Sequence, residues 1–156
     1  MNELLENTSI DHKVIGFCLD HQFFNKTKNI LENEMFSGHL KEIFNTISFA
    51  HTNYEKDLSR DELFALHVDK HPAMPLSTKN EVMSIIKLLP PDANNYELQM
   101  DVVKNFWLRD RARVIGEKAI SIFTGQDEDF GELQRIMDTV ENGRMDSKAT
   151  YTEVES

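Results

Sequence analysis

One stretch of the sequence, NNYELQMDVVKNFWLRDRARVIGEKAISIF (94–123), constrains the fold more than any other. It contains no proline and its apolar residues recur at helical spacing, so it predicts a single helix from Tyr96 to Phe123. At 1.5 Å per residue such a helix is roughly 42 Å long. That length exceeds the width of a domain of about 80–90 residues. The second half of the helix must therefore project beyond the body on which the first half packs.

The residues after this helix predict an antiparallel partner for its projecting half. TGQDED (124–129) is a turn, and an apolar stripe over 130–142 predicts a second helix, with Asp129 and Glu132 as a capping box and Gly143 after its last turn. Two helices alone leave apolar surface uncovered, which is typical of a protein–protein site. We expect this hairpin interface to comprise Phe106, Trp107, Arg109, Arg113, Ile122, Phe123, Leu133 and Met137.

The chain before the long helix predicts a compact head of about five short helices. Their apolar residues recur every three or four positions, and β-branched alternation is scarce, so we expect an all-α fold. Ser9, Asp20, Ser59 and Ser77 are the expected N-caps, and proline pairs end the last two helices. The helices are expected at about 9–19, 20–31, 40–47, 59–71 and 77–89. We therefore divide the chain into a head (1–92), a hairpin (93–143) and a polar tail or linker (144–156).

The charge balance argues against nucleic acid as the main partner. The formal net charge is −10, and an acidic surface repels a phosphate backbone. Arg109 and Arg113 share one face of the long helix, whereas Arg111 lies on the other side. Asp110 and Glu117 are within helical reach of Arg113, so local ion pairs are expected. Binding of single-stranded DNA by this chain alone should be weak.

No motif in the sequence indicates catalysis. A phosphate-binding loop of the GxxxxGK[ST] type, a GxSxG elbow and a CxxC pair are all missing from the sequence. His67 and His71 have the spacing of two metal ligands, but a zinc site needs a third, and we expect both to be solvated. Cys18 lies on an apolar stripe and should be buried. We expect no catalytic, metal or cofactor-binding residue, and no enzyme activity from this chain alone.

The sequence also indicates where such a protein works. No apolar run approaches about 18 residues, and MNELLENTSIDHK has no signal-peptide pattern. A single cysteine fits a reducing compartment. These features predict a cytoplasmic protein that does not span a membrane.

Two segments resemble a known family. SIDHKVIGFCLDHQFFNKTKNILENEMFSGHLKEIFNTI (9–47) resembles the opening of the N-terminal domain of DnaB-type replicative helicases, with Gly16 and Leu19 in the first helix. LLPPDANNYELQMDVVKNFWLRDR (88–111) is similar to the family's proline-terminated helix followed by a long helix. The resemblance covers about 9–142, looks nearest to the T-even phage helicase, and departs from the bacterial pattern at 51–76.

The resemblance implies a function in DNA replication. Such domains pair into dimers and form a hexameric collar on a motor, where the collar binds primase and the helicase loader and lets single-stranded DNA pass. ATP and Mg²⁺ would be expected only in that motor, which this chain lacks, so the host cytoplasm is the expected location. Two alternatives stay open: a stand-alone adaptor that mimics the collar, and a helical DNA-binding module. A reading frame that continues into a phosphate-loop motif would separate the collar from the adaptor.

Overall fold

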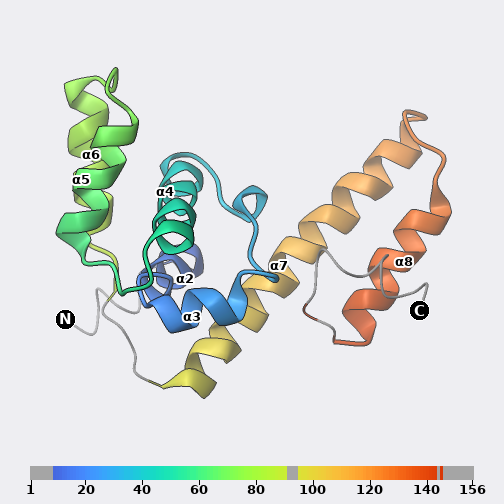
Figure 1. The fold of residues 1–156 in the computed structure, drawn as a ribbon. Helices are drawn as coiled ribbons and strands as arrows, with labels where there is room; N and C mark the ends of the chain where they lie inside the picture. The colour runs from blue at the N-terminus through green and yellow to red at the C-terminus, as the bar shows by residue number, and fades with distance from the viewer. Residues whose placement is uncertain (1–8, 91–94, 144, 146–156) are drawn as a thin grey trace.

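The structure is a computed structural model and describes residues 9–90, 95–143 and 145. Over these residues it is built from α-helices and one short 3-10 helix, with no strand, which confirms the predicted all-α fold. In chain order the elements are α2 (Ile10–Phe17), α3 (His21–Thr27), η1 (Asn33–Met35), α4 (His39–Asn53), α5 (Arg60–Lys70), α6 (Leu76–Lys87), α7 (Tyr96–Phe123) and α8 (Phe130–Glu141) (Figure 1).

The head comprises α2–α6 together with the first half of α7. Helix α4 stands at its centre, with α2 and α3 on one side and the α5–α6 pair on the other (Figure 1). The core cluster draws residues from all of these helices and includes Val103 and Phe106 of α7. The core therefore crosses from the predicted head into the predicted hairpin. The boundary drawn between them at 92/93 lies outside the described residues.

The long helix has the bounds that the sequence predicted. All of its buried residues lie between Gln99 and Asp110, where α7 packs on α2. Beyond Asp110 the helix leaves the head, and α8 runs back along it as an antiparallel partner (Figure 1). This confirms the projecting second half. None of the described helices combines the length and apolar composition needed to cross a membrane.

Several helix starts follow from local chemistry and match the sequence. The Asp20 carboxylate accepts a hydrogen bond from the Phe23 N–H at 3.0 Å, at the start of α3. Ser59 and Glu62 form a reciprocal capping box on α5, with bonds of 3.1 and 2.9 Å. Such caps satisfy N–H groups that have no partner within the helix.

Of the other predicted helix starts, Ser77 was wrong, while Ser9 and Asp129 occupy the predicted N-cap positions without all of the expected hydrogen bonds. Ser9 stands at the N-cap position of α2, but its hydroxyl bonds to the side chains of Asp11 and His12 instead of a backbone N–H. Ser77 lies inside α6, whose N-cap position is occupied by Pro75. At α8 the capping box is only half formed. Asp129 accepts from the Glu132 N–H, whereas the Glu132 carboxylate pairs with Arg135.

Two helix lengths also differ from the expectation. Helix α3 ends at Thr27 and not near residue 31, while α4 continues to Asn53 instead of ending near residue 47. Periodicity alone cannot locate either end, because it does not distinguish a buried apolar residue that continues the helix from one that reaches the core in another backbone conformation. Leu31 is buried in a non-helical segment, and Ala50 extends the buried face of α4.

Candidate protein-interaction surface on the helical hairpin

The hairpin is closed by a short ordered turn. The Thr124 N–H donates to the Ile120 carbonyl at 2.9 Å, and Gly125 follows with φ of 83°, a conformation that glycine adopts without strain. Lys118 of α7 pairs with Asp127 across the turn. This pairing raises the pKa of the Lys118 amine and lowers that of the Asp127 carboxyl. The turn thus holds α7 and α8 in a defined relation.

Two of the eight predicted interface residues face inwards. Phe106 is buried in the head core and stacks on Phe36 with ring centroids 5.0 Å apart. Trp107 is fully buried as well. The expectation that these two aromatic side chains belong to the interface does not fit their burial, because α7 is still inside the head at this point. They anchor the long helix and offer no surface to a partner.

The remaining predicted residues lie on the projecting part of the hairpin. Ile122 and Leu133 are half-buried, as expected for residues beside the packed face between α7 and α8. Arg109 and Arg113 are exposed. Phe123 is 89% exposed, the highest value among the large apolar side chains of the described residues, and Met137 is also exposed.

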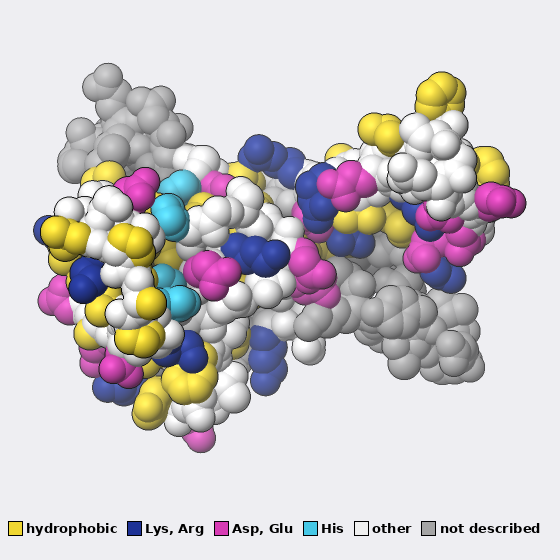
Figure 2. Space-filling view, turned by 90° about the horizontal axis from the view of Figure 1, so that it is seen from above, with side chains coloured by type: hydrophobic (Ala, Val, Ile, Leu, Met, Phe, Trp, Pro, Cys, Tyr) yellow, Lys and Arg dark blue, Asp and Glu magenta, His cyan; other side chains and the backbone are white. Residues whose placement is uncertain are grey.

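The structure adds two residues that the sequence reasoning missed. Ile120 is 65% exposed and Phe130 is similarly open. Neither residue is among the eight that the sequence predicts for the interface. Phe130 belongs to the apolar stripe predicted over 130–142. Their position next to the turn, where neither helix continues, was the feature of the sequence that could have indicated their exposure. We call the exposed apolar residues of the hairpin the tip surface: Ile120, Phe123 and Phe130 beside the turn, and Met137 about two helical turns further along α8. In Figure 2 individual hydrophobic side chains protrude from the hairpin, with polar atoms between them.

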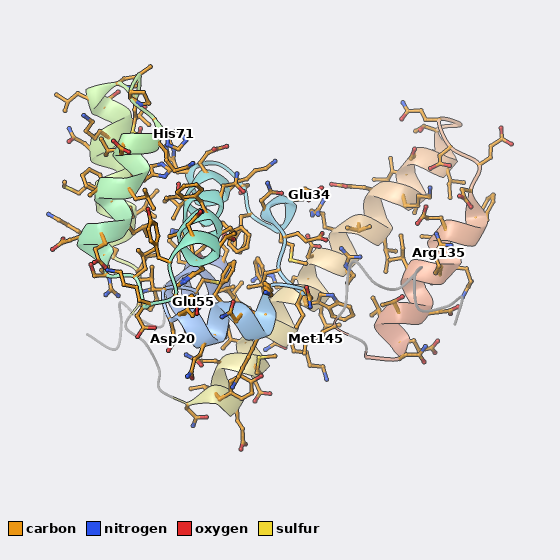
Figure 3. The ribbon with its side chains drawn as sticks, in the orientation of Figure 1. Asp20, Glu34, Glu55, His71, Arg135 and Met145 are labelled. Atoms are coloured by element: carbon orange, nitrogen blue, oxygen red, sulfur yellow. The ribbon has the colours of Figure 1, made fainter. Side chains whose placement is uncertain are left out.

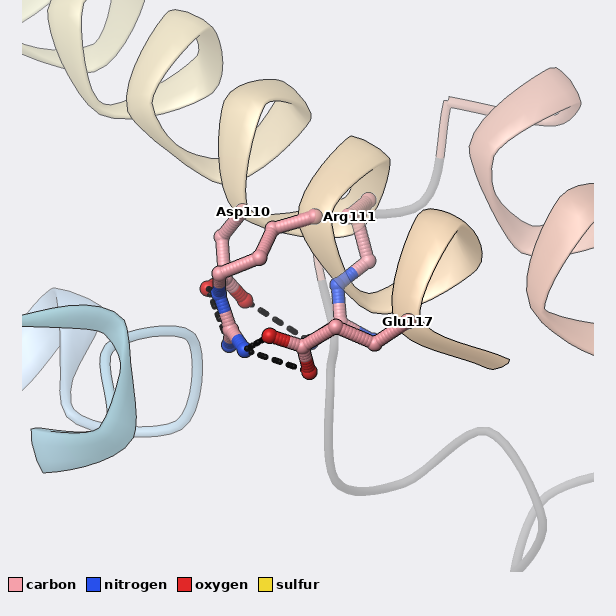
Figure 4. A network of polar contacts seen from close by, with 4 residues as sticks. Asp110, Arg111 and Glu117 are labelled. Carbon is pink, nitrogen blue, oxygen red and sulfur yellow. Dashed lines mark hydrogen bonds and ion pairs between the residues drawn. The ribbon is translucent and has the colours of Figure 1, made fainter. Parts of the chain in front are cut away.

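An ion-pair network lies where α7 leaves the head (Figure 4). The Asp110 side chain is only 4% exposed and accepts hydrogen bonds from Arg113 at 2.7 Å and from Arg111 at 2.9 Å. Arg113 also reaches Glu117 at 3.0 Å. The hydrogen bonds that Arg113 donates to Asp110 raise the pKa of the Arg113 guanidinium. These contacts confirm the predicted pairing of Arg113 with Asp110 and Glu117.

The network leaves little cationic charge for phosphate. Arg111 and Arg113 are both occupied by carboxylates, so phosphate contacts would require these pairs to break. Arg109 forms no ion pair with the described residues, but it is a single charge. The carboxylates of Asp127, Glu128 and Asp129 follow at the turn. A surface of this composition suits a protein partner better than nucleic acid.

After α8 the chain returns to the head. Met145 is partly buried and packs against the head core (Figure 3). The rest of the predicted tail, 144 and 146–156, lies outside the described residues. Where α8 ends, Gly143 has φ of 71°, as expected for a residue just past a helix C-terminus.

The two histidines with metal-ligand spacing are not solvated as a pair. His67 is buried, and only His71 reaches the surface, so the prediction was wrong for His67. The described residues contain no cluster of three or more metal-ligating side chains. Cys18 is buried as predicted, and burial raises the pKa of its thiol well above the usual range.

Two shallow clefts lie on the head. One, of about 230 Å³, is lined by Gly16, Leu19, Asp20, Asp57, Leu58, Ser59, Arg60 and Pro90. Its polar groups already serve the fold: Asp20 and Asp57 accept backbone N–H bonds, and Arg60 donates to the Leu89 and Pro90 carbonyls. The other, of about 300 Å³, lies between α3, η1 and α4.

Comparison of the chain with protein-family models, with curated proteins and with solved structures gave no match.

Proposed function

We propose that this chain is the N-terminal collar domain of a phage replicative helicase of the DnaB type. In this role it would act in DNA replication as a protein-interaction and oligomerisation domain, and ATP hydrolysis would belong to a motor domain elsewhere in the parent protein. The observation that carries the proposal is α7, a 28-residue helix that starts inside the head and continues into a projecting hairpin.

The order of the elements supports this function. The proposal rests on short capped helices, an acidic turn at NEMF (33–36), a helix with Ile43 and Phe44, a proline-terminated helix and then a long helix. In the structure NEM forms η1, and Ile43 and Phe44 are buried in α4. The residues that carry the sequence resemblance are therefore structural residues of the head, which is what a shared fold would require.

The tip surface supports an interaction role. Phe123 and Ile120 are large, apolar and exposed at the turn end of the α7–α8 hairpin. Apolar aromatic side chains at the centre of an interface commonly contribute about 2 kcal/mol or more when buried. We propose that the hairpins of two chains pack together through this surface. Primase and the helicase loader are the proposed further partners.

The decisive measurement for the hairpin is the mass of the chain in solution. Light scattering at high micromolar concentration should give a dimer or a larger species for the wild type. Ile120→Asp should shift this equilibrium towards the monomer. Leu76→Asp is the matched control, because Leu76 is 70% exposed and Ile120 is 65% exposed, but Leu76 lies on the head. The control should associate like the wild type.

A strictly monomeric wild type would refute association through this surface. Equal loss of association in the two variants would also count against it, because the effect would then not depend on the hairpin.

The replication role needs a separate test. The chain should retain the primase of the same replication system in a pull-down, and the parent reading frame should continue into a GxxxxGK[ST] motif. A stop codon after Ser156, with primase still bound, would favour the stand-alone adaptor.

A further inference from the structure

A buried histidine joins α5 to α4. His67 lies on α5, is 2% exposed, and places Nδ1 at 2.7 Å from the Thr46 hydroxyl on α4. Thr46 donates its own proton to the Glu42 carbonyl at 3.2 Å. Its oxygen must therefore accept from His67, which requires the neutral Nδ1–H tautomer or the imidazolium.

A second imidazole lies against the first. His71, one turn further along, stacks on His67 with ring centroids 4.4 Å apart. Its Nδ1 donates to the His67 carbonyl at 2.8 Å. His71 is the more exposed ring, and its Nε2 lies 3.8 Å from the Glu42 carboxylate of α4.

Among the described residues, no carboxylate is bonded to His67 itself to stabilise a positive charge on its ring. The titratable groups that act on it are His71 on its own helix and His39 and Glu42 on α4. Glu81 of α6 lies 3.8 Å from His39. Glu42 and Glu81 are exposed, and neither is hydrogen-bonded to the His67 ring. The imidazolium would keep its hydrogen bond to Thr46, so protonation weakens the α4–α5 contact through the cost of burying a cation without a bonded carboxylate.

The contact that His67 makes matters because α5 and α6 form the outer layer of the head. Helix α5 packs on α4 and on α6 (Figure 1). At the other end of this pair the Arg60 guanidinium of α5 donates to the Leu89 carbonyl beyond α6 at 2.6 Å, which ties the two helices to each other. The Leu58 N–H, just before α5, donates to the Leu19 carbonyl beyond α2 at 2.9 Å and links this end to the rest of the head.

We propose that His67 is an acid-sensitive latch: the neutral imidazole holds the α5–α6 pair against α4, and its protonation releases this pair before the rest of the head unfolds. This device is independent of the function proposed for the hairpin.

The direction of the pH dependence follows from the buried ring. Burial, followed by the positive charge of His71, lowers the pKa of His67 to about 4. In the open state the ring is solvated and its pKa returns to about 6.5. The closed state therefore has its full stability above pH 6.5 and loses it progressively down to about pH 4. One proton taken up on opening raises the opening equilibrium about twentyfold between pH 7 and pH 5.

A second buried histidine provides an internal comparison. His51, also on α4, donates from Nε2 to the Cys18 carbonyl at 2.7 Å, and its Nδ1 lies 2.9 Å from that of His21. Burial lowers its pKa, but the nearby carboxylates of Asp57 and Asp20 oppose that shift. The α2–α3 side of α4 should therefore respond less to acid than the α5 side.

Amide hydrogen exchange of the whole chain at pH 7 and pH 5, corrected for intrinsic rates, tests the latch. In the wild type the opening of α5 and α6 should increase about twentyfold while α2 and the first half of α7 stay protected. His67→Gln should remove this acid response, because its amide can still donate to Thr46 but cannot be protonated. His12→Gln is the control, because His12 is a partly exposed residue of α2, and this variant should keep the acid response.

The titration of the His67 ring by NMR gives a second readout that needs no variant. Its midpoint should lie well below that of a free histidine and coincide with the release of α5 and α6. A midpoint near 6.5, equal opening of every helix, or an acid response that persists in His67→Gln would each overturn the proposal.

Discussion

Gly16 of α2 lies directly against Pro90, three residues beyond the end of α6. A Cβ atom built on Gly16 would be 3.0 Å from the Pro90 carbonyl oxygen and 3.4 Å from its ring. Both neighbours are constrained, since Pro90 is buried and its carbonyl accepts a bond from Arg60 at 3.0 Å. Gly16 is thus the close-approach point between the first helix and the last residues of the α5–α6 layer.

This contact predicts that Gly16→Ala destabilises the head despite the higher helix propensity of alanine. Overpacking of this kind costs roughly 1–3 kcal/mol of unfolding free energy. Gly116→Ala in α7 is the matched control, because no atom lies within 4 Å of a Cβ there. It should be neutral or stabilising by up to about 1 kcal/mol. Urea denaturation of both variants checks the pair, and a Gly16→Ala variant as stable as the control would contradict the contact.

The two serines at helix starts should differ when truncated. Ser59→Ala removes a capping box and should cost about 1 kcal/mol of stability. Ser9→Ala removes a hydroxyl that bonds only to side chains, so its cost should stay within about 0.5 kcal/mol. Thermal melts under identical conditions measure both. Equal losses would mean that Ser9 caps α2 in solution.

Trp107 should contribute to folding and not to association. Its side chain is fully buried, so Trp107→Ala should cost about 3–5 kcal/mol, as other large core truncations do. The indole Nε1 has no hydrogen-bond partner among the described residues, so Trp107→Phe should lose much less. Circular dichroism during chemical denaturation gives the stability, and light scattering on folded Trp107→Phe gives the mass. A monomeric Trp107→Phe beside an associating wild type would place Trp107 in the interface after all.

We expect single-stranded DNA to bind this chain no more tightly than a Kd of ~10⁻⁴ M at physiological salt, the weak end of non-specific binding. The physical reason is the net charge of −10 and the engagement of Arg111 and Arg113 by Asp110. Fluorescence anisotropy against salt concentration measures it, with Arg109→Ala as the variant that removes the unpaired arginine. Submicromolar binding in about 0.15 M salt that is lost in Arg109→Ala would restore a phosphate-binding role.

Much of the fold could be predicted because its causes are local. The bounds of α7 follow from a long run without proline between an Asn cap and a Thr-Gly turn, and the structure has the same bounds. Asp20 and Ser59 cap their helices because the acceptor and the N–H group are only three residues apart. The ion pairs of Arg113 likewise depend on helical spacing alone. Backbone geometry settles such contacts before any tertiary packing forms.

Only the tertiary structure decided which apolar and ionisable residues are covered. Trp107 and Phe123 lie on the same helix and both belong to its apolar pattern, yet one is fully buried and the other is 89% exposed. The difference arises because the head covers α7 only as far as Asp110. His67 is likewise covered by a neighbour from another part of the chain, because α4 packs on α5 and places Thr46 within hydrogen-bond distance of its ring. Periodicity shows which face of a helix can be buried, whereas the neighbour that buries it comes from distant parts of the chain.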